Sequence, residues 1–252
     1  MFTANNLKTV ILLGLLTGLV LAVGQLLGGT GGLVIALLFV GVMNFAMYWF
    51  SDKIALKSMR AHEVSAQDAP ELHQMVDRVV AAAGMPKPKV YIAENPSPNA
   101  FATGRNPQNA AVAVTTGIQG LLTPRELEAV IGHELGHVQN RDTLISTVAA
   151  TLAGVITFAS RMMLFGAMFG GGRDRGGSPL LQLALIILAP IAAILIQLAI
   201  TRSREYQADR TGAELTRDPL GLASALAKLE GGNVKLKEAG VLNEKSENPA
   251  FA

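Results

Sequence analysis

Residues 123–137 have the sequence TPRELEAVIGHELGH. Thr123, Pro124 and Glu126 form a strong helix start, with Thr as N-cap, Pro at the first helical position and Glu completing a capping box. On the helix that follows, His133 and His137 are four residues apart and therefore share one face, about 5–6 Å from each other. This segment predicts a helix that presents two imidazoles to one point.

The pattern H-E-x-x-H on a helix is typical of a zinc site, in which both histidines bind the metal at about 2.0–2.1 Å. Glu134 then lies one residue round from His133, where it reaches a metal-bound water without being a ligand. The alternative is a helix whose histidines only pack or form hydrogen bonds. The chain has two further histidines, His62 and His73, and both are isolated, which favours surface or interface positions.

A catalytic zinc site normally has three protein ligands and one open position. The sequence contains no cysteine, so we expect a carboxylate as the third ligand. Glu205 and Asp209 are four residues apart in RSREYQAD, residues 202–209. One of them can bind the metal while the other accepts the second ring N–H of a ligand histidine. A solvated helix face rich in arginine is the alternative for this pair.

The charged residues are unevenly distributed. They make up 16% of the chain, against about a quarter in soluble domains. Residues 9–51 carry no charge, and residues 143–201 carry few. A membrane span needs roughly 20 apolar residues, so each region predicts two spans, separated at glycine-rich breaks near 28–32 and 170–179. An ordinary soluble domain is excluded.

The domain organisation follows from these regions. We expect an N-terminal transmembrane hairpin at 1–50, a domain with the HELGH helix at 51–143, a second transmembrane hairpin at 144–200, and the rest of the HELGH domain at 201–252. The second hairpin returns the chain to the side it left, so that Glu205 can meet His133. Lys8 and Lys53 flank the first hairpin, which predicts that its ends face the cytoplasm.

Within residues 51–143 the pattern predicts a small mixed domain. A helix is expected with Asp68 as its N-cap and Gly84 at its end, and strands are expected at 89–92 and 111–116. A short extended piece with the sequence NAFATG, residues 99–104, lies between them and can form an open sheet edge. Arg161, in or just past the third span, is interpreted as an anchor that reaches the membrane surface.

Three motifs carry a resemblance to a known family: HELGHVQNRD at 133–142, NAFATG at 99–104 and SREYQAD at 203–209. Together they resemble the HtpX family of bacterial membrane-bound zinc endopeptidases, which belongs to the gluzincins together with the CAAX prenyl proteases. The resemblance implies one Zn²⁺ per chain, bound by His133, His137 and Glu205. It further implies Glu134 as catalytic base and Asp209 as the hydrogen-bond partner of a ligand histidine.

The resemblance also implies a fold and a location. We expect an α+β integral membrane protein with four transmembrane helices and a cytoplasmic gluzincin-like zinc protease domain that contains a small β-sheet. Its expected place is the bacterial inner membrane, as a multi-pass protein with the active site facing the cytoplasm. The family usually continues past residues 248–250 into a segment with a His-Pro-Pro-type motif, so the resemblance implies that this sequence is shortened.

The implied reaction is the hydrolysis of peptide bonds in misfolded or damaged membrane proteins, as part of stress-related quality control. Expected partners are polypeptide substrates and the lipid bilayer, and no nucleic acid. An extended substrate can add to the sheet edge formed by Asn99, Ala100, Phe101, Ala102, Thr103 and Gly104; the alternative is an ordinary hairpin edge. Two other functions stay open: a membrane adaptor or chaperone-like protein with a structural zinc, and a specific CAAX-type processing protease.

Overall fold

The computed structural model describes residues 4–27, 29–169 and 179–238. The glycine-rich break predicted between the third and fourth spans lies outside the described residues at 170–178, as does the polar tail at 239–252. The chain divides into two compact units. Unit 1 comprises Met1–Tyr48 and Leu144–Glu205, and unit 2 comprises Trp49–Thr143 and Tyr206–Ala252.

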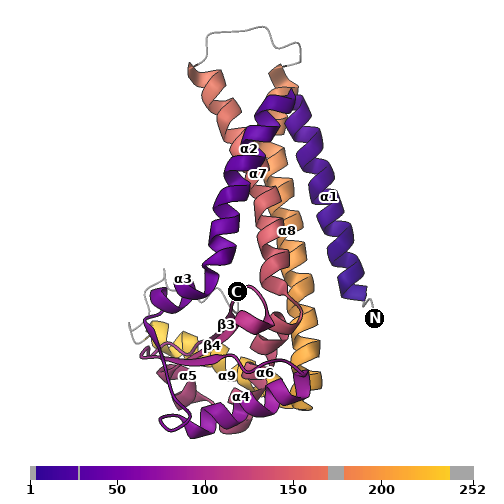
Figure 1. The fold of residues 1–252 in the computed structure, drawn as a ribbon. Coiled ribbons are helices and arrows are strands. Elements are labelled where there is room, and N and C mark those ends of the chain that lie inside the picture. The colour runs from indigo at the N-terminus through magenta and orange to yellow at the C-terminus, as the bar shows by residue number, and fades with distance from the viewer. Residues whose placement is uncertain (1–3, 28, 170–178, 239–252) are drawn as a thin grey trace. The chain divides into compact units, whose positions relative to one another are not determined.

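Unit 1 is built from long helices. They are α1 (Ala4–Leu27), α2 (Gly29–Trp49), all but the first residues of α7 (Asp142–Phe169), and the part of α8 (Pro179–Thr216) up to Glu205. Helices α1 and α2 lie where the first pair of spans was predicted, but α2 begins at Gly29, inside the glycine-rich break predicted near 28–32. Figure 1 shows these helices. Leu16 of α1, Ile156 of α7 and Ala193 of α8 are fully buried and belong to one hydrophobic cluster.

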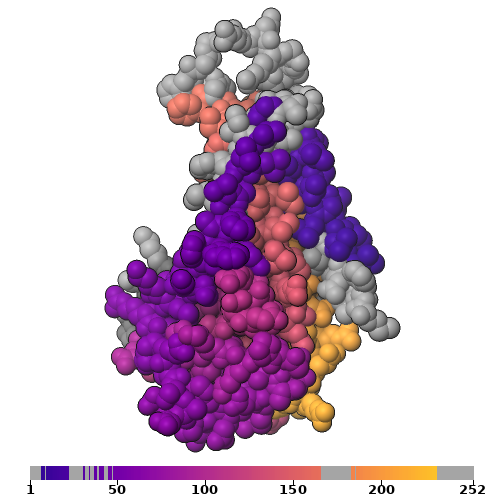
Figure 2. All heavy atoms as spheres, in the orientation of Figure 1, coloured from indigo at the N-terminus to yellow at the C-terminus, as the bar shows by residue number. Residues whose placement is uncertain are grey.

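The outer surface of unit 1 is apolar. Side chains of α7 lie at the surface between those of α1 and α2 (Figure 2), and many large apolar side chains are more than half exposed, among them Leu38, Val42, Leu195 and Leu198. Among the described residues, two segments are long and apolar enough to cross a membrane, Asp142–Phe165 and Ile186–Thr216, and α1 contains a shorter apolar stretch, Val10–Ala22. Such a surface indicates a membrane environment.

Unit 2 contains a four-stranded mixed sheet with the order β1-β2-β4-β3. The central strands β2 (Lys89–Ala93) and β4 (Ala111–Thr115) are parallel, and they confirm the two strands expected from the sequence. The outer strands β1 (Ala61–Glu63) and β3 (Ala100–Thr103) are antiparallel to their neighbours. The sheet edge predicted at 99–104 is therefore β3.

Helices enclose the core of unit 2. They are α3 (Ser51–Ser58), α4 (Pro70–Ala83), α5 (Thr116–Leu121), α6 (Pro124–Gln139) and α9 (Pro219–Glu238), with a short 3₁₀ turn at Pro107–Asn109. Helix α4 ends at Gly84 as expected, in left-handed backbone. The expected N-cap was wrong: Ala69 holds that position, because the Asp68 carboxylate instead accepts hydrogen bonds from the backbone and hydroxyl of Ser65.

The start of α6 is fixed by a polar network around Glu126. The predicted capping box with Thr123 is confirmed. The buried carboxylate also accepts hydrogen bonds from Lys228 Nζ (2.7 Å) and Ser224 Oγ (2.6 Å) of α9. The Lys228 ammonium, Ser224 and the Thr123 backbone lower the pKa of Glu126 to about 2. These contacts fix the helix that carries the HELGH sequence against α9.

Candidate metal centre

Two imidazole rings of α6 face each other. His133 and His137 lie one turn apart, and their Nε2 atoms are 3.2 Å from each other. The ring planes are nearly perpendicular, at 89°. His133 is buried, and His137 is partly buried. Helical spacing thus directs one nitrogen of each ring to a common point.

A carboxylate lies beside the other nitrogen of each ring. Asp142 Oδ2 is 2.8 Å from His137 Nδ1, and Asp209 Oδ1 is 3.0 Å from His133 Nδ1. The contact between His137 and Asp142 is a hydrogen bond. Because an ionised carboxylate only accepts hydrogen bonds, it assigns the proton of a neutral His137 ring to Nδ1. The Nε2 lone pair of His137 is then directed toward His133, where a cation would lie.

Glu205 supplies a third donor. It precedes Asp209 by one turn of the continuous helix α8. One of its carboxylate oxygens and one nitrogen of each histidine all lie within 4.8 Å of one another. In the part of the chain that the structure describes, these three residues form the one such group of possible metal ligands.

The donor set fits a zinc ion. Two nitrogens bound tetrahedrally at 2.0–2.1 Å would be about 3.3 Å apart, close to the observed 3.2 Å between the Nε2 atoms. Two imidazole nitrogens and a carboxylate oxygen are a set found in catalytic zinc sites, which leave a fourth position open.

The other two histidines lie away from this group. His62 is exposed on β1, and His73 Nε2 is 3.0 Å from the carbonyl oxygen of Val64. Both positions agree with the surface and interface interpretation made from the sequence.

Glu134 connects the histidine pair to the sheet. Its side chain is buried, and Oε2 accepts a hydrogen bond from the backbone N–H of Ala102 at 3.1 Å. Ala102 lies on β3, within the NAFATG segment. The structure therefore brings together the glutamate of the HELGH sequence and the edge strand, two features that the sequence pointed to separately.

Close packing of α6 against α8 positions Asp209. A Cβ atom added to Gly212 would lie 2.7 Å from the backbone nitrogen of His133, and one added to Gly136 would lie 3.1 Å from the carbonyl oxygen of Ala208. Only residues without a side chain allow this approach. Glycine inside a helix lowers the stability of that helix. The presence of Gly136 and Gly212 in helical segments was therefore the signal in the sequence for the close contact.

Sequence reasoning gave no role to Asp142. It is the first residue of α7, five positions after His137, so the two do not share a face of one helix. They meet because α6 ends at Gln139 and Arg141 adopts left-handed backbone with φ 57°. The hydrogen bond from Asn140 Nδ2 to Thr211 Oγ1 (3.1 Å) ties this turn to α8.

The arrangement is typical of a metallopeptidase: two histidines on one helix, a carboxylate from a second helix, and a glutamate beside the first histidine. Residues 66–247 match the model of peptidase family M48. The match covers most of the chain, and the chain belongs to this family. It is a membrane metalloprotease.

The relatives agree with this assignment. A protease HtpX homolog of Persephonella marina is 54% identical over 228 residues, which are 90% of this chain and 79% of that protein. A second, from Desulforapulum autotrophicum, is 52% identical over 229 residues, 89% of this chain and 74% of that protein. Both alignments cover most of each protein.

A solved structure shares the fold. The crystal structure of S. mikatae Ste24p superposes with a TM-score of 0.57 over 94% of this chain, at 18% sequence identity. This chain spans 58% of the length of that protein. At such low identity the likeness concerns the fold alone.

Proposed function

We propose that this metalloprotease uses zinc to cleave misfolded or damaged membrane proteins at the cytoplasmic face of the bacterial inner membrane. His133, His137 and Glu205 hold one zinc ion, and Asp142 and Asp209 keep the two imidazoles in the orientation that binds it. The observation that carries this proposal is the pair of Nε2 atoms 3.2 Å apart, each on a ring backed by a carboxylate. Carboxylates in that position fix the tautomer of a metal-binding histidine.

Glu134 is the proposed general base. The chemistry supplied by a bound zinc ion is the activation of water near neutral pH and the polarisation of the scissile carbonyl. Glu134 takes the proton of the attacking water and passes it to the leaving amine, a role typically worth about 10²–10⁴ in rate. The hydrogen bond from Ala102 N–H holds its carboxylate in place.

The edge strand β3 is the proposed substrate-binding element. The register pairs Ala100 with Val114, and one position earlier the Thr115 N–H donates to the Asn99 carbonyl oxygen. Because antiparallel pairs alternate, Phe101 and Thr103 also direct their backbone polar groups at β4, whereas those of Ala100 and Ala102 point to the open edge. The Ala102 N–H donates to Glu134, so an extended substrate would pair through its backbone with the Ala100 groups and the Ala102 carbonyl oxygen. Pairing through the backbone supports broad specificity. Asn99 and Gly104 flank the strand.

Unit 1 is the proposed membrane anchor, with four spans arranged as hairpins at 1–50 and 144–200. The protease domain is then formed by 51–143 together with 201–252. The apolar surface of this unit supports the proposal. Because the chain contains no cysteine, single substitutions such as Gly31→Cys and Ser58→Cys can be labelled one at a time. We expect labelling of Ser58→Cys from the cytoplasmic side and of Gly31→Cys from the opposite side.

Metal content and proteolysis of the full chain test the reaction. The chain is purified in detergent, its zinc is measured, and cleavage of casein is followed for the wild type, Glu134→Gln and Glu205→Gln. Glu134→Gln should retain one zinc per chain and lose at least about a hundredfold in cleavage rate. Glu205→Gln should lose both zinc and activity, because the carboxylate ligand is removed.

The control is Glu128→Gln, the same chemical change on the same helix, at a residue that pairs with Arg78. It should keep both zinc and activity. A Glu134→Gln variant that cleaves at the wild-type rate would exclude Glu134 as the base. Stoichiometric zinc without cleavage in the wild type would favour a structural zinc site and an adaptor role. Cleavage restricted to prenylated peptides would favour a CAAX-type processing protease.

A further inference from the structure

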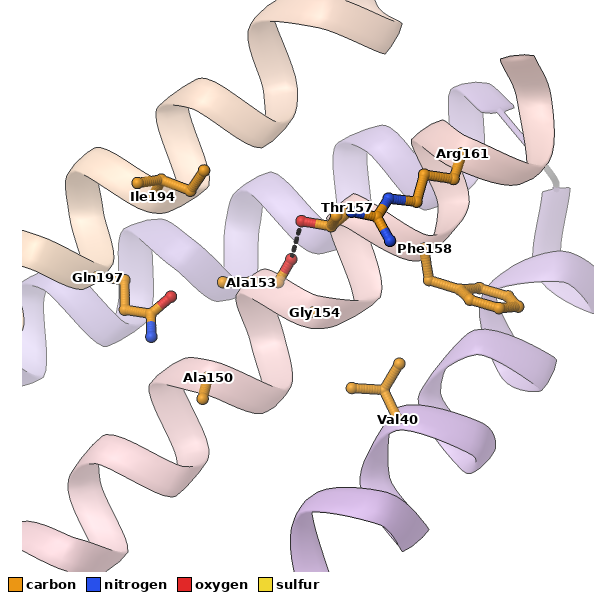
Figure 3. A pocket seen from close by; sticks show the side chains of 9 residues that line it. All are labelled: Val40, Ala150, Ala153, Gly154, Thr157, Phe158, Arg161, Ile194 and Gln197. Atoms are coloured by element: carbon orange, nitrogen blue, oxygen red, sulfur yellow. Dashed lines mark hydrogen bonds between the residues drawn. The ribbon is translucent and has the colours of Figure 1, made fainter. Parts of the chain in front are cut away.

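Unit 1 contains a groove that the proposed reaction does not use. It has a volume of about 390 Å³ and is lined by α2, α7 and α8 (Figure 3). Its floor consists of small residues of α7, Ala150, Ala153 and Gly154. Val40 of α2 and Ile194 of α8 form its apolar sides.

Gly154 determines how closely α2 approaches this floor. A Cβ atom added there would lie 2.8 Å from Cγ1 of Val40. The lining residues of α7 recur at positions 150, 153, 154, 157, 158 and 161, the spacing of one helix face. The groove therefore follows the axis of α7 and is a continuous feature of one side of that helix.

Polar side chains mark the two ends of the groove. Gln197 points into it at one end, and the guanidinium of Arg161 turns back toward Thr157 at the other (Figure 3). The Thr157 hydroxyl donates to the Ala153 carbonyl oxygen at 3.0 Å. Within the described ranges, neither the Arg161 guanidinium nor the Gln197 amide has a hydrogen-bond or ion-pair partner.

The position of Arg161 along α7 suits a lipid headgroup. It follows Leu144, the first residue of this helix in unit 1, by roughly 26 Å of helix at 1.5 Å per residue. A hydrocarbon core is about 30 Å thick, so in a spanning helix Arg161 lies close to the far headgroup layer. An unpaired guanidinium at that depth attracts an anion, and a phosphate accepts its paired N–H groups.

The distribution of apolar and charged groups along the groove favours a lipid. The groove extends over roughly 16 Å of helix from Ala150 to Arg161. Most of its lining is apolar, and the guanidinium of Arg161 lies at one end. A single extended hydrocarbon chain with an anionic headgroup matches this distribution.

We propose that this groove binds one anionic phospholipid, with an acyl chain along Ala150, Gly154 and Ile194 and with the phosphate on Arg161. The site extends the earlier interpretation of Arg161 from a surface anchor to a specific ligand contact. It depends on membrane insertion of unit 1 but not on peptidase activity.

Native mass spectrometry of the full chain tests this site. The protein carries Glu134→Gln so that self-cleavage does not interfere, and it is released from nanodiscs that contain equal amounts of dioleoyl phosphatidylglycerol and dioleoyl phosphatidylcholine. We expect retention of one phosphatidylglycerol, with about a fivefold preference over phosphatidylcholine, the selectivity that one basic residue near a membrane surface provides.

Two further substitutions separate the headgroup from the acyl chain. Arg161→Gln should abolish the preference while some lipid of both kinds stays bound, and Arg161→Lys should keep most of the preference. Ala150→Phe fills the groove and should remove the retained lipid of either kind. The matched control is Ala199→Phe, the same change at an exposed residue of α8 outside the groove, which should behave as the parent protein.

Three results would overturn the proposal. They are equal retention of the two lipids by the parent protein, an unchanged preference in Arg161→Gln, and unchanged lipid retention in Ala150→Phe. Displacement of the lipid by a hydrophobic transmembrane peptide, with no effect of Arg161→Gln, would assign the groove to polypeptide instead. Loss of proteolysis in the wild type, with lipid retention intact, would contradict the proposed reaction and leave the lipid site standing.

Discussion

The two units place their large apolar side chains in opposite ways. In unit 1, Leu195 and Val42 are 62% and 66% exposed, and many neighbours are similar. In unit 2, the large apolar side chains gather between the sheet and helices α4, α6 and α9, and an exposed one such as Leu220 is an exception. This difference supports the proposal that lipid hydrocarbon surrounds unit 1, whereas water surrounds unit 2.

The largest expected effect comes from a comparison in which an exposed leucine is changed to aspartate in each unit. Leu195→Asp should cost about 3–4 kcal/mol, the difference between a leucine and an aspartate at the centre of a membrane helix. Leu220→Asp should change stability by no more than about 0.5 kcal/mol, as is usual for surface positions in water. The measurement is unfolding of the full chain in nanodiscs, together with its yield in the membrane fraction. Equal effects at the two sites would contradict the membrane placement of unit 1.

A smaller effect is expected at the carboxylate beside His137 in unit 2. Asp142→Asn removes the charge beside His137 Nδ1 and should lower zinc affinity or cleavage rate by about 10–100-fold. Zinc affinity is measured by competition with a chelator, and cleavage is measured at saturating zinc. The control is Asp77→Asn, at an exposed residue that pairs with Lys87, and it should leave both quantities unchanged. Wild-type zinc affinity and activity in Asp142→Asn would exclude the orienting role.

The smallest effect depends on pH. The pKa of Glu126 is lowered to about 2 from 4.5, so its carboxylate stabilises unit 2 above pH 4.5, and this contribution is lost as the pH falls toward 2. Because Lys228 is partly exposed, we expect Glu126→Gln to cost on the order of 1–2 kcal/mol at pH 7. Denaturant unfolding at pH 7, 4 and 2.5 should show the difference from wild type shrinking. A constant difference would contradict the role of the charge.

Local patterns predicted much of the fold. The capping box at Thr123, the helix of the HELGH sequence and the strands at 89–92 and 111–116 follow from neighbouring residues, because periodicity and capping act over a few positions. The N-cap at Asp68 was wrong, since its carboxylate had a competing partner in Ser65. That competition depends on the turn geometry, which propensity does not describe.

The part of the candidate site that lies within one helix could be predicted from the sequence. Spacing within one helix pointed to His133 and His137, but it left open which of Glu205 and Asp209 binds the metal. The contact of Asp142 with His137 depends on the left-handed backbone of Arg141. An arginine carries no signal for that conformation, since left-handed backbone favours glycine or asparagine.

The hydrogen bond from Ala102 to Glu134 has a consequence for the tolerance of position 102 to mutation. Its donor is a backbone N–H, so replacing the side chain leaves the donor in place. Proline is the exception, because it has no N–H. At an edge position whose N–H points away from the sheet, proline also leaves the pairing with β4 intact. Ala102→Pro would therefore release the carboxylate of Glu134 without altering any residue of the metal centre.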